Sequence, residues 1–306
     1  MSSSDPAVSS GISLKPGRDG PIRKRHHPWI YSQAVAQVGA NDFSDPLPVH
    51  SADGTTIGWG LYSPDSLIAV RMISFSAEEP QKDWVERRMQ AAKSLRAALG
   101  IDSDAMRLVN AEGDSLPGLV VDLYADTAVV SAHARAMEDR AERIADQLLS
   151  LYQGIAVYLK RDEHYARVEK LRHASGYLRG GGEGTSIITE AGTRLRVDFA
   201  QGQKTGYYLD QRENRSIIAR CCAGRTVLNL FSYTGAVALR AAAAGALRVV
   251  SVDSSKRALE IGAESVKLNP VLGEGIFSWV QEDVFTFLEG RETWDLIVAD
   301  PPPFAR

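Results

Sequence analysis

The chain has 306 residues, of which 44% are hydrophobic and 24% are charged. This length indicates two or three domains and the composition is that of a globular protein, which excludes a single small module and a disordered chain. The formal net charge of −3 gives no overall basic excess of the kind that indicates nucleic-acid binding. The two cysteines, Cys221 and Cys222, are adjacent, so they indicate neither a disulfide framework nor a metal site. We therefore expect a reducing, cytoplasmic setting and no metal.

The opening residues MSSSDPAVSSG lack the pattern of a signal peptide, and no apolar run reaches the roughly 18 residues of a membrane span. We expect a soluble protein that does not bind membranes. Two segments are nevertheless locally basic. Residues 11–31 contain five basic residues against one acidic residue, and residues 160–180 contain six against three. Each segment is a candidate site for an anionic partner.

The first part of the chain, residues 12–76, consists of short apolar runs separated by turn-forming residues such as Asp53-Gly54. This pattern predicts a small β-rich domain. Apolar residues then recur at helical spacing, which predicts a helix that begins at Asp83 as N-cap and ends at Gly100.

Residues 83–182 predict a central α+β domain, with strands near 106–110, 119–122, 128–130 and 155–159 and a helix over 137–151. Four glycines within residues 180–184 mark its boundary. The segment 185–306 predicts a hairpin over 185–199, followed by alternating strands and helices. The predicted strands are 226–230, 248–252, 276–280 and 294–299, and the predicted helices are 236–244, 256–268 and 284–288. Such alternation predicts a parallel, Rossmann-like sheet that is covered on both faces.

Ligands of open parallel sheets bind beyond the carboxyl ends of the strands. The small-residue turn at 231–235 precedes a predicted helix, and its free N–H groups would suit a carboxylate or a phosphate. Asp253 lies 24 positions after Asn229, near the spacing of about 20 residues at which an acidic residue binds ribose hydroxyls. Asp283 follows the next strand and could accept a hydrogen bond from an adenine amino group.

The turn at 229–235 contains one glycine, whereas NAD and FAD require a Gly-x-Gly-x-x-Gly turn. A nucleoside cofactor with a carboxylate and no pyrophosphate, such as S-adenosylmethionine, fits better than a dinucleotide. After the last strand comes Asp300-Pro301-Pro302-Pro303-Phe304. The prolines leave carbonyls unpaired, so Asp300 could contact a planar base on which Phe304 stacks.

Several motifs together resemble the PUA-domain-containing class I methyltransferases that make 5-methylcytosine in 23S ribosomal RNA. They are Lys204-Thr205-Gly206-Tyr207-Tyr208-Leu209-Asp210-Gln211-Arg212, Asn229-Leu230-Phe231-Ser232-Tyr233-Thr234-Gly235, Val252-Asp253-Ser254-Ser255, Asp300-Pro301-Pro302, Arg25-His26-His27-Pro28-Trp29-Ile30, Gly60-Leu61-Tyr62-Ser63-Pro64 and residues 112–119. The resemblance implies a PUA-like barrel over 12–76, a central domain over 83–182 and an S-adenosylmethionine-dependent methyltransferase domain over 185–306.

The resemblance, which adds Lys204, Thr205, Tyr208 and Asp210, and the positions after the predicted strands together assign roles to individual residues. Those expected to bind the cofactor are Lys204, Thr205, Tyr208, Asp210, Asn229, Phe231, Ser232, Gly235, Asp253, Ser254 and Asp283. Those expected to bind RNA are Arg23, Lys24, Arg25 and His26, which lie beside Trp29. Asp300 is expected to orient the base. A homodimer is left open.

Two departures from the family pattern affect these expectations. Pro303 stands where the family usually has lysine, and the cysteine expected to attack C6 of cytosine belongs to a region that would follow Arg306. We therefore expect an incomplete sheet with an exposed fourth strand, and a fragment that is inactive or poorly soluble alone. The alternative function is an RNA-binding protein with a vestigial methyltransferase domain. An NAD-linked oxidoreductase is disfavoured by the missing glycines.

Overall fold

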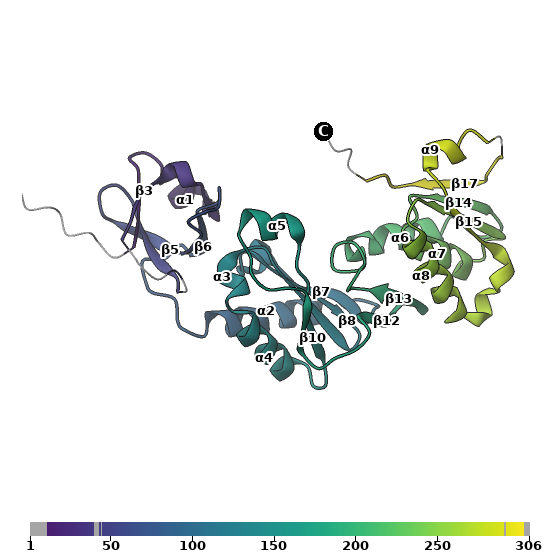
Figure 1. Cartoon of the computed structure of the whole chain (residues 1–306), viewed down its shortest axis with the longest axis horizontal. Helices are drawn as coiled ribbons and strands as arrows, with labels where there is room; N and C mark the ends of the chain where they lie inside the picture. Colours follow the sequence, from purple (N-terminus) through teal and green to yellow (C-terminus); the bar gives the residue numbers. More distant parts are fainter. Residues whose placement is uncertain (1–10, 40–42, 44, 291, 303–306) are drawn as a thin grey trace, which may run out of the picture. The chain divides into compact units, whose positions relative to one another are not determined.

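The computed structural model describes residues 11–39, 43, 45–290 and 292–302 (Figure 1). The chain divides into two compact units. The first comprises residues up to 101 together with 107–122 and 127–181, and the second comprises 102–106, 123–126 and residues from 182 onward. Of the helices that the described ranges contain, none is long and apolar enough to cross a membrane.

The N-terminal segment forms a six-stranded mixed sheet in the order β2-β6-β5-β4-β1-β3, which confirms the predicted β-rich domain. Its strands are β1 Ile12–Leu14, β2 Trp29–Ile30, β3 Val35–Val38, β4 Leu47–His50, β5 Thr56–Tyr62 and β6 Val70–Ser74. The short helix α1, Gly20–Arg25, lies between β1 and β2, and the 3-10 turn η1, Ser32–Ala34, follows β2. Ile12, Val49 and Val70 are fully buried in the core of this sheet.

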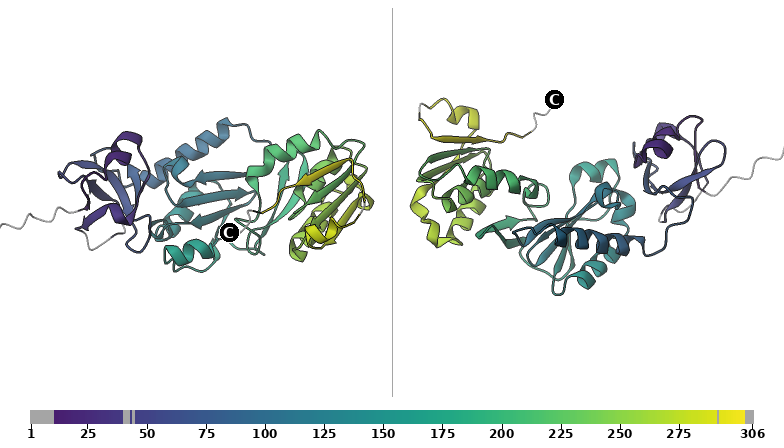
Figure 2. Two further views of the ribbon diagram at one scale, coloured as in Figure 1. Left: turned by 90° about the horizontal axis from the view of Figure 1, so that it is seen from above. Right: turned by 180° about the vertical axis from the view of Figure 1, so that it is seen from behind.

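The central segment forms a five-stranded sheet in the order β11-β10-β9-β8-β7. Its strands are β7 Ala105–Asn110, β8 Leu119–Tyr124, β9 Thr127–Ala132, β10 Ala156–Leu159 and β11 Gly176–Arg179. Its helices are α2 Trp84–Ala98, α3 Arg135–Glu138, α4 Ala141–Leu151 and α5 Glu163–Val168, with the 3-10 turn η2 Ala111–Asp114 after β7. Helices α2 and α4 lie together against the sheet (Figure 2).

Three details of this segment differ from the sequence prediction. The helix predicted over 137–151 is interrupted at Asp139 and Arg140, and strand β11 was not predicted. Asp83 precedes α2 as expected, but its side chain makes no cap hydrogen bond. Its Oδ2 instead accepts from Arg87 Nε at 2.8 Å, one helical turn along the chain. The nearby arginine thus competes with the backbone for this carboxylate.

The main part of the second unit, from residue 182 onward, begins with the predicted hairpin, formed by β12 Thr185–Glu190 and β13 Thr193–Asp198 in antiparallel register. A loop then leads into the 3-10 turn η3, Leu209–Gln211, and helix α6, Arg212–Ala219. Ser265 and Asn269 accept from the backbone N–H groups of Arg196 and Arg194, so the hairpin is bonded to the end of helix α8, Lys256–Lys267.

The remaining strands form a four-stranded sheet with β14 Thr226–Leu230, β15 Arg248–Asp253, β16 Phe277–Gln281 and β17 Leu296–Ala299. All three pairings are parallel and the order is β16-β15-β14-β17, which confirms the predicted parallel sheet. Helices α7 Ala236–Ala243, α8 and α9 Val284–Phe287 connect the strands, with the 3-10 turns η4 Pro270–Leu272 and η5 Glu274–Ile276 before β16.

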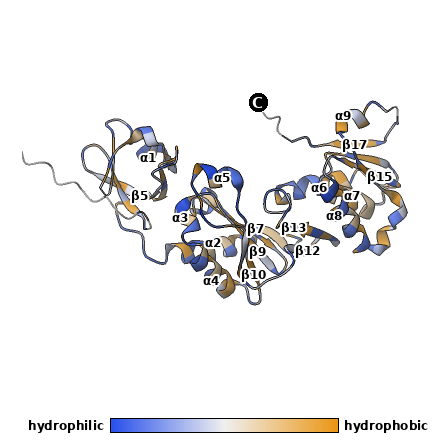
Figure 3. Ribbon diagram, viewed as in Figure 1, coloured by the Kyte–Doolittle hydropathy of each residue, from blue (hydrophilic) through white to orange (hydrophobic). Residues whose placement is uncertain are grey.

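Alternate residues of these strands face two separate cores. Helices accordingly lie on both faces of the sheet (Figures 1 and 3). Val227 and Val249 pack against α7, whereas Leu228 and Val250 pack against Val284 of α9. On one side of β14 the next strands are β15 and then β16, whereas β17 pairs with β14 on its other side. Such a reversal of direction marks the crevice where ligands of open parallel sheets bind.

Candidate functional site

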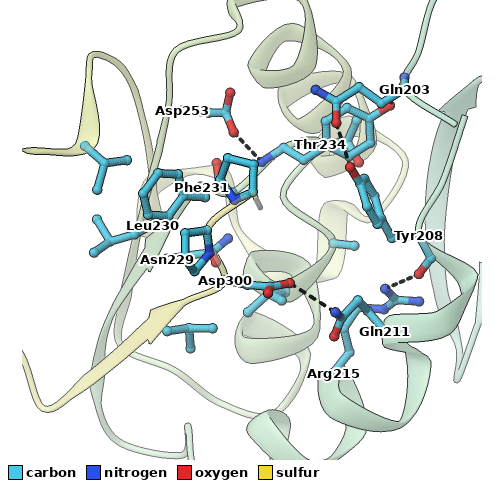
Figure 4. Close-up of a pocket in the computed structure, with 18 of the residues that line it drawn as sticks. Gln203, Tyr208, Gln211, Arg215, Asn229, Leu230, Phe231, Thr234, Asp253 and Asp300 are labelled. Carbon is cyan, nitrogen blue, oxygen red and sulfur yellow. Dashed lines mark hydrogen bonds between the residues drawn. The ribbon is translucent and has the colours of Figure 1, made fainter. Parts of the chain in front are cut away.

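A pocket of about 520 Å³ lies at the carboxyl ends of β14, β15 and β17, on both sides of the point where the strand order reverses (Figure 4). Its walls come from the turn after β14, from the residues that follow β15, β16 and β17, and from the loop between β13 and α6. Ten residues predicted from the sequence line it: Lys204, Tyr208, Asp210, Asn229, Phe231, Ser232, Asp253, Ser254, Asp283 and Asp300.

The carboxylate of Asp253, at the end of β15, is held by backbone donors. Its Oδ2 accepts from Tyr233 N and its Oδ1 from Ser255 N, each at 2.8 Å. These two bonds fix the plane of the carboxylate, and each oxygen can still accept another hydrogen bond. Asp253 is therefore arranged to accept from hydroxyl groups of a ligand in the pocket.

Two polar groups, one near the end of β14 and one in the turn that follows it, are buried without a partner among the described residues. Asn229 Nδ2 and Ser232 Oγ make no hydrogen bond with the described residues, and both residues line the pocket. A buried polar atom that lacks a partner costs about 1–3 kcal/mol. A ligand that carries polar groups, such as an amino-acid moiety, would remove this cost. The donor set therefore fits S-adenosylmethionine, whose methionine end is polar.

The backbone of the same turn differs from the sequence prediction. The N–H groups of Ser232, Tyr233 and Gly235 donate within the protein, to Val252 O, Asp253 Oδ2 and Ser232 O. The predicted array of free N–H groups is therefore wrong for these three residues. These three N–H groups have acceptors within the protein because Phe231 and Tyr233 adopt left-handed conformations, with φ of 52° and 48°, that fold the turn back on itself.

Asp283 and Asp300 follow the last two strands. Asp283 Oδ1 accepts from Phe285 N at 2.9 Å and from Thr286 N at 3.2 Å, so this carboxylate caps α9 while lining the pocket. Asp300 Oδ2 accepts from Gln211 Nε2 at 3.1 Å (Figure 4). Gln211 Oε1 in turn accepts from Asn214 Nδ2 at 2.6 Å, which fixes the orientation of the amide. Phe304 and Pro303, which also entered the sequence prediction, lie outside the described residues.

The loop before α6 contributes the opposite wall. Lys204 Nζ lies 3.2 Å from Asp210 Oδ2 and 4.1 Å from the centre of the Tyr208 ring. The Tyr208 hydroxyl donates to Gln203 Oε1 at 2.6 Å. Burial raises the pKa of Tyr208 above its usual value, so this hydroxyl remains a donor at neutral pH. The wall is thus formed by polar side chains that bind one another.

Two predicted residues lie outside the pocket lining. Thr205 is buried, and its Oγ1 is 2.9 Å from the hydroxyl of Tyr124 on β8. Gly235 has φ +68°, and a Cβ added there would lie 2.5 Å from Cζ3 of Trp279. Glycine at this position is needed for packing against the tryptophan.

Several lining residues were not predicted, among them Gln203, Gln211, Arg215 and Tyr233. Arg215 is 3% exposed, and it binds Glu190 through Nε and Nη2 at 2.7 Å each. Its Nη1 donates to Tyr208 O at 2.9 Å (Figure 4). The spacing of Gln211 and Arg215, four residues apart before and within α6, was a usable signal, since such residues share one helix face.

The basic residues predicted to bind RNA lie on α1 and directly after it. Arg23, Lys24, Arg25 and His26 are all exposed. Arg23 is paired with Asp19 at 3.4 Å, and the His26 ring stacks on Phe75 with centroids 4.7 Å apart. An exposed cationic surface beside a stacked aromatic pair suits a polyanion that carries bases.

The second basic segment, residues 160–180, behaves differently. Arg179 binds Glu142 and Asp146 at 2.6 Å each, and Arg161 binds Glu163 and the carbonyls of Leu171 and His173. Lys170 is paired with Asp65 of the N-terminal domain at 3.0 Å. These cations bind groups of the chain itself, so this segment is a weaker candidate for an anionic partner than α1.

Neither cysteine lines the pocket. Cys221 is exposed, whereas Cys222 is buried in the core formed with Val227 and Ala238, and burial raises the pKa of its thiol. Within the described ranges, no group of three His, Cys, Asp or Glu side chains is placed to hold a metal ion.

Comparisons with known proteins identify the family. The family described as S-adenosylmethionine-dependent methyltransferase matches residues 131–306, and the PUA-like domain family matches residues 12–75. Ribosomal RNA large subunit methyltransferase I of Shewanella denitrificans (strain OS217) is 38% identical over 305 residues, which cover 96% of this chain and 76% of the relative. The protein of the same name from Serratia proteamaculans (strain 568) is 36% identical, with the same coverage.

The crystal structure of SMU.776 complexed with SAH superposes with a TM-score of 0.79 at 27% identity, covering 96% of this chain and 76% of that one. The methyltransferase match covers more than half of the chain, and the relatives align with nearly all of it. The chain therefore belongs to the family of S-adenosylmethionine-dependent methyltransferases that carry an N-terminal PUA-like domain, and S-adenosylmethionine is its cofactor.

Proposed function

We propose that this chain methylates ribosomal RNA of the large subunit, at C5 of a cytosine. The observation that carries the proposal is the pocket at the reversal point of the sheet, where ten residues predicted from the sequence lie together. The names of the relatives support ribosomal RNA as substrate. The choice of cytosine C5 rests on the motif resemblance described above.

In this proposal the pocket binds the cofactor through polar groups that the protein leaves available. The cofactor supplies a methyl group on a positively charged sulfur. Asp253 binds the ribose hydroxyls, because both of its oxygens are fixed by backbone donors and keep free acceptor sites. Asn229 and Ser232 bind the amino-acid end, because their buried polar atoms otherwise have no partner among the described residues. Asp283 accepts from the adenine amino group.

Asp300 and the prolines after it form the proposed site for the base. The carboxylate of Asp300 is held by Gln211, so it can accept from an exocyclic amino group in a defined orientation. Methylation at C5 also requires a nucleophile that adds to C6. Neither Cys221 nor Cys222 lines the pocket, so the proposal assigns this nucleophile to no residue that the structure describes.

The N-terminal domain provides the proposed contact with RNA through residues that do not line the cofactor pocket. Lys24 and Arg25 are exposed on α1, and Phe75 stacks with His26 beside them. Cations there would attract phosphates, and this attraction would weaken as salt rises. Because the proposed substrate is ribosomal RNA, we place the protein in the cytoplasm. The homodimer remains a prediction that light scattering can test.

Calorimetric titration of S-adenosylhomocysteine tests the cofactor site. We expect micromolar binding by the full chain and at least tenfold weaker binding by Asp253→Asn, since hydrogen bonds to a charged group contribute about 1.5–3 kcal/mol. Asp146→Asn is the matched control, because Asp146 is a surface carboxylate paired with Arg179 and does not line the pocket. A folded wild-type chain that binds no S-adenosylhomocysteine would contradict the cofactor site and favour an RNA-binding protein with a vestigial domain.

The substrate is tested by incubating the chain with large-subunit RNA and S-adenosylmethionine, followed by mass spectrometry of the digested nucleosides. A gain of 5-methylcytidine supports the whole proposal. Methylation of another base or of a nitrogen would overturn the choice of C5 and keep the methyltransferase activity. RNA left unmethylated by a chain that binds S-adenosylhomocysteine would overturn the proposed activity of this chain.

A further inference from the structure

One wall of the cofactor pocket is a loop, residues 203–211, which we call the strap. It enters the pocket after the hairpin β12–β13 and ends at α6. Lys204 and Gly206 within it have φ values of 48° and 118°, so the backbone turns sharply twice in three residues. The strap contributes Gln203, Lys204 and Tyr208, among others, to the lining of the pocket.

The backbone on both sides of the first turn of the strap is bonded to one side chain, that of Tyr233. The Tyr233 hydroxyl accepts from Gln203 N at 2.9 Å and donates to Gly206 O at 3.1 Å. Its ring also meets the ring of Tyr208 edge to face, with centroids 5.3 Å apart. One hydroxyl thus satisfies a donor and an acceptor of the strap backbone on either side of its first turn.

The backbone of the same tyrosine holds the opposite wall. Tyr233 N donates to Asp253 Oδ2, which is the carboxylate proposed to bind the ribose. The φ of 48° at Tyr233 allows its N–H to reach the sheet while its side chain points to the strap. Figure 4 shows Asp253, Tyr208 and Gln203 around this turn. Tyr233 is therefore bonded to both walls of the pocket.

The Tyr233 hydroxyl is buried and keeps its proton. Burial raises the pKa of Tyr233 to about 12, so the hydroxyl keeps its proton and can donate to Gly206 O at neutral pH. A Cβ added at Gly202 would lie 2.7 Å from this hydroxyl, so the strap approaches it closely only because residue 202 is glycine.

The far end of the strap is bonded to the other half of the site. Gln211 donates to Asp300, and Arg215 donates to the carbonyl of Tyr208. A strap held at one end by Tyr233 and at the other by Gln211 connects the carboxylate proposed for the ribose with the one proposed for the base.

We infer that Tyr233 is a positioning residue that ties the strap to Asp253, so that binding of the cofactor and ordering of the strap occur as one event. The inference rests on the proposed cofactor site. By the reciprocity of linked equilibria, any ligand that orders the strap also strengthens cofactor binding. The hydroxyl of Tyr233 is the group that carries this linkage.

The test is the Tyr233→Phe variant of the full chain, measured by calorimetry with S-adenosylhomocysteine and by hydrogen exchange of the strap amides. Phenylalanine keeps the ring contact with Tyr208 and the bond from residue 233 N to Asp253, so we expect the variant to fold. Loss of two hydrogen bonds to the strap should raise the Kd about 5- to 10-fold. At saturating S-adenosylhomocysteine, strap amides of the variant should exchange faster than those of the wild type, with exchange in β14 and β15 unchanged.

A tyrosine with a merely structural role would behave differently, since its loss would speed exchange throughout the unit. Tyr152→Phe is the matched control, because Tyr152 lies in the first unit and outside the pocket lining. Should Tyr233→Phe fail to fold, Tyr208→Phe provides a second test, since it removes the bond to Gln203 from a partly exposed position and should also speed strap exchange.

The inference would be overturned if Tyr233→Phe and Tyr208→Phe both bound S-adenosylhomocysteine with the wild-type Kd and both showed wild-type exchange of the strap amides. A wild-type chain that binds no S-adenosylhomocysteine would instead overturn the proposed cofactor site, so the two failures give different results.

Discussion

Arg71 of β6 and Glu169, just after α5, form a buried ion pair that joins the N-terminal sheet to the central domain. Arg71 Nη2 donates to Glu169 Oε1 at 2.7 Å, and Nη1 donates to Oε2 at 3.3 Å. The side chains are 5% and 1% exposed, and Ser66 Oγ also donates to Glu169 Oε1 at 2.6 Å. The two segments are thus joined by a carboxylate that accepts three hydrogen bonds.

Arg71→Met should destabilise the chain by about 3–5 kcal/mol, because it leaves a buried carboxylate without its cation. The double variant Arg71→Met, Glu169→Leu should recover most of this loss, since it removes both charges. Urea unfolding followed by circular dichroism measures both. Lys170→Met is the control, because its pair with Asp65 is exposed and should contribute less than about 1 kcal/mol. An Arg71→Met variant that is as stable as Lys170→Met would contradict the prediction.

His133 should make the stability of the chain depend on pH. Burial lowers the pKa of His133 to about 4, and the ring stacks on Tyr165 with centroids 3.9 Å apart. The unfolded chain therefore binds this proton more tightly than the native chain. The contribution of neutral His133 to the free energy of unfolding is fully present above about pH 6.5. It is lost as the pH decreases toward about 4, which lowers the free energy of unfolding by up to about 3 kcal/mol.

His133→Phe keeps the stacked ring and cannot take up the proton. The free energy of unfolding should therefore fall less in this variant than in the wild type between about pH 7 and about pH 5. Subtracting the free energies of unfolding of the two proteins at each pH removes the contributions of the other titratable groups, which both proteins share. Parallel pH curves for both proteins would show that His133 does not contribute.

Gln211→Ala should separate catalysis from cofactor binding. Removing the amide that holds Asp300 leaves this carboxylate free to rotate, so the proposed base contact loses its orientation. We expect kcat for RNA methylation to fall about tenfold, which corresponds to about 1.4 kcal/mol, with the Kd for S-adenosylhomocysteine changed less than twofold. Glu213→Ala in the following helix α6 is the control, since Glu213 is exposed and does not line the pocket. Equal effects of the two variants would rule out the role of Gln211.

The double variant Lys24→Ala, Arg25→Ala should weaken RNA binding and flatten its salt dependence. Each phosphate contact that is lost should reduce the slope of log K against log salt by about 0.7–0.9. Arg179→Ala is the control, because its guanidinium binds Glu142 and Asp146. Fluorescence anisotropy with labelled RNA at several salt concentrations measures the slopes. A slope in the double variant equal to that of the wild type would place the RNA contact elsewhere.

The sequence predicted the architecture of the second unit well because its strands and helices alternate with clear periodicity. The carboxylates Asp253, Asp283 and Asp300 could be placed in one pocket because parallel strands bring their carboxyl ends to one edge of a sheet. The helix over 137–151 was less predictable, since its break at Asp139 and Arg140 interrupts no apolar pattern.

Residues that act through contacts distant in sequence could not be predicted. The hydroxyl of Tyr233 binds the backbone 27 and 30 positions upstream, and Arg215 binds Glu190 across 25 positions. A single sequence contains no signal for such pairs. Thr205 and Gly235 belong to well-matched motifs and were assigned to cofactor binding for that reason, whereas their contacts are with Tyr124 and Trp279.

Gly235 and Gly224 have similar backbone conformations but differ in the space around them. Both glycines adopt left-handed backbone, with φ of +68° and +71°, so alanine at either position costs roughly 1–2 kcal/mol of backbone strain. A Cβ at Gly224 meets no atom within 4 Å, whereas a Cβ at Gly235 would overlap the Trp279 ring. Gly262 of α8 packs on the same ring, with its added Cβ 2.5 Å from Cη2, so the indole has little room to move.

Gly235→Ala should therefore be less stable than Gly224→Ala by a further 1–3 kcal/mol or so, the usual cost of overpacking. It should also weaken binding of S-adenosylhomocysteine, because the turn that carries Ser232 and Tyr233 ends at this glycine. Adding Trp279→Leu should reduce the cost of Gly235→Ala and leave that of Gly224→Ala unchanged, since only the first clash involves the indole. Thermal melts of the single and double variants measure these differences. Equal stability of the two alanine variants would mean that the indole moves aside, and that glycine at position 235 is required only for its backbone conformation.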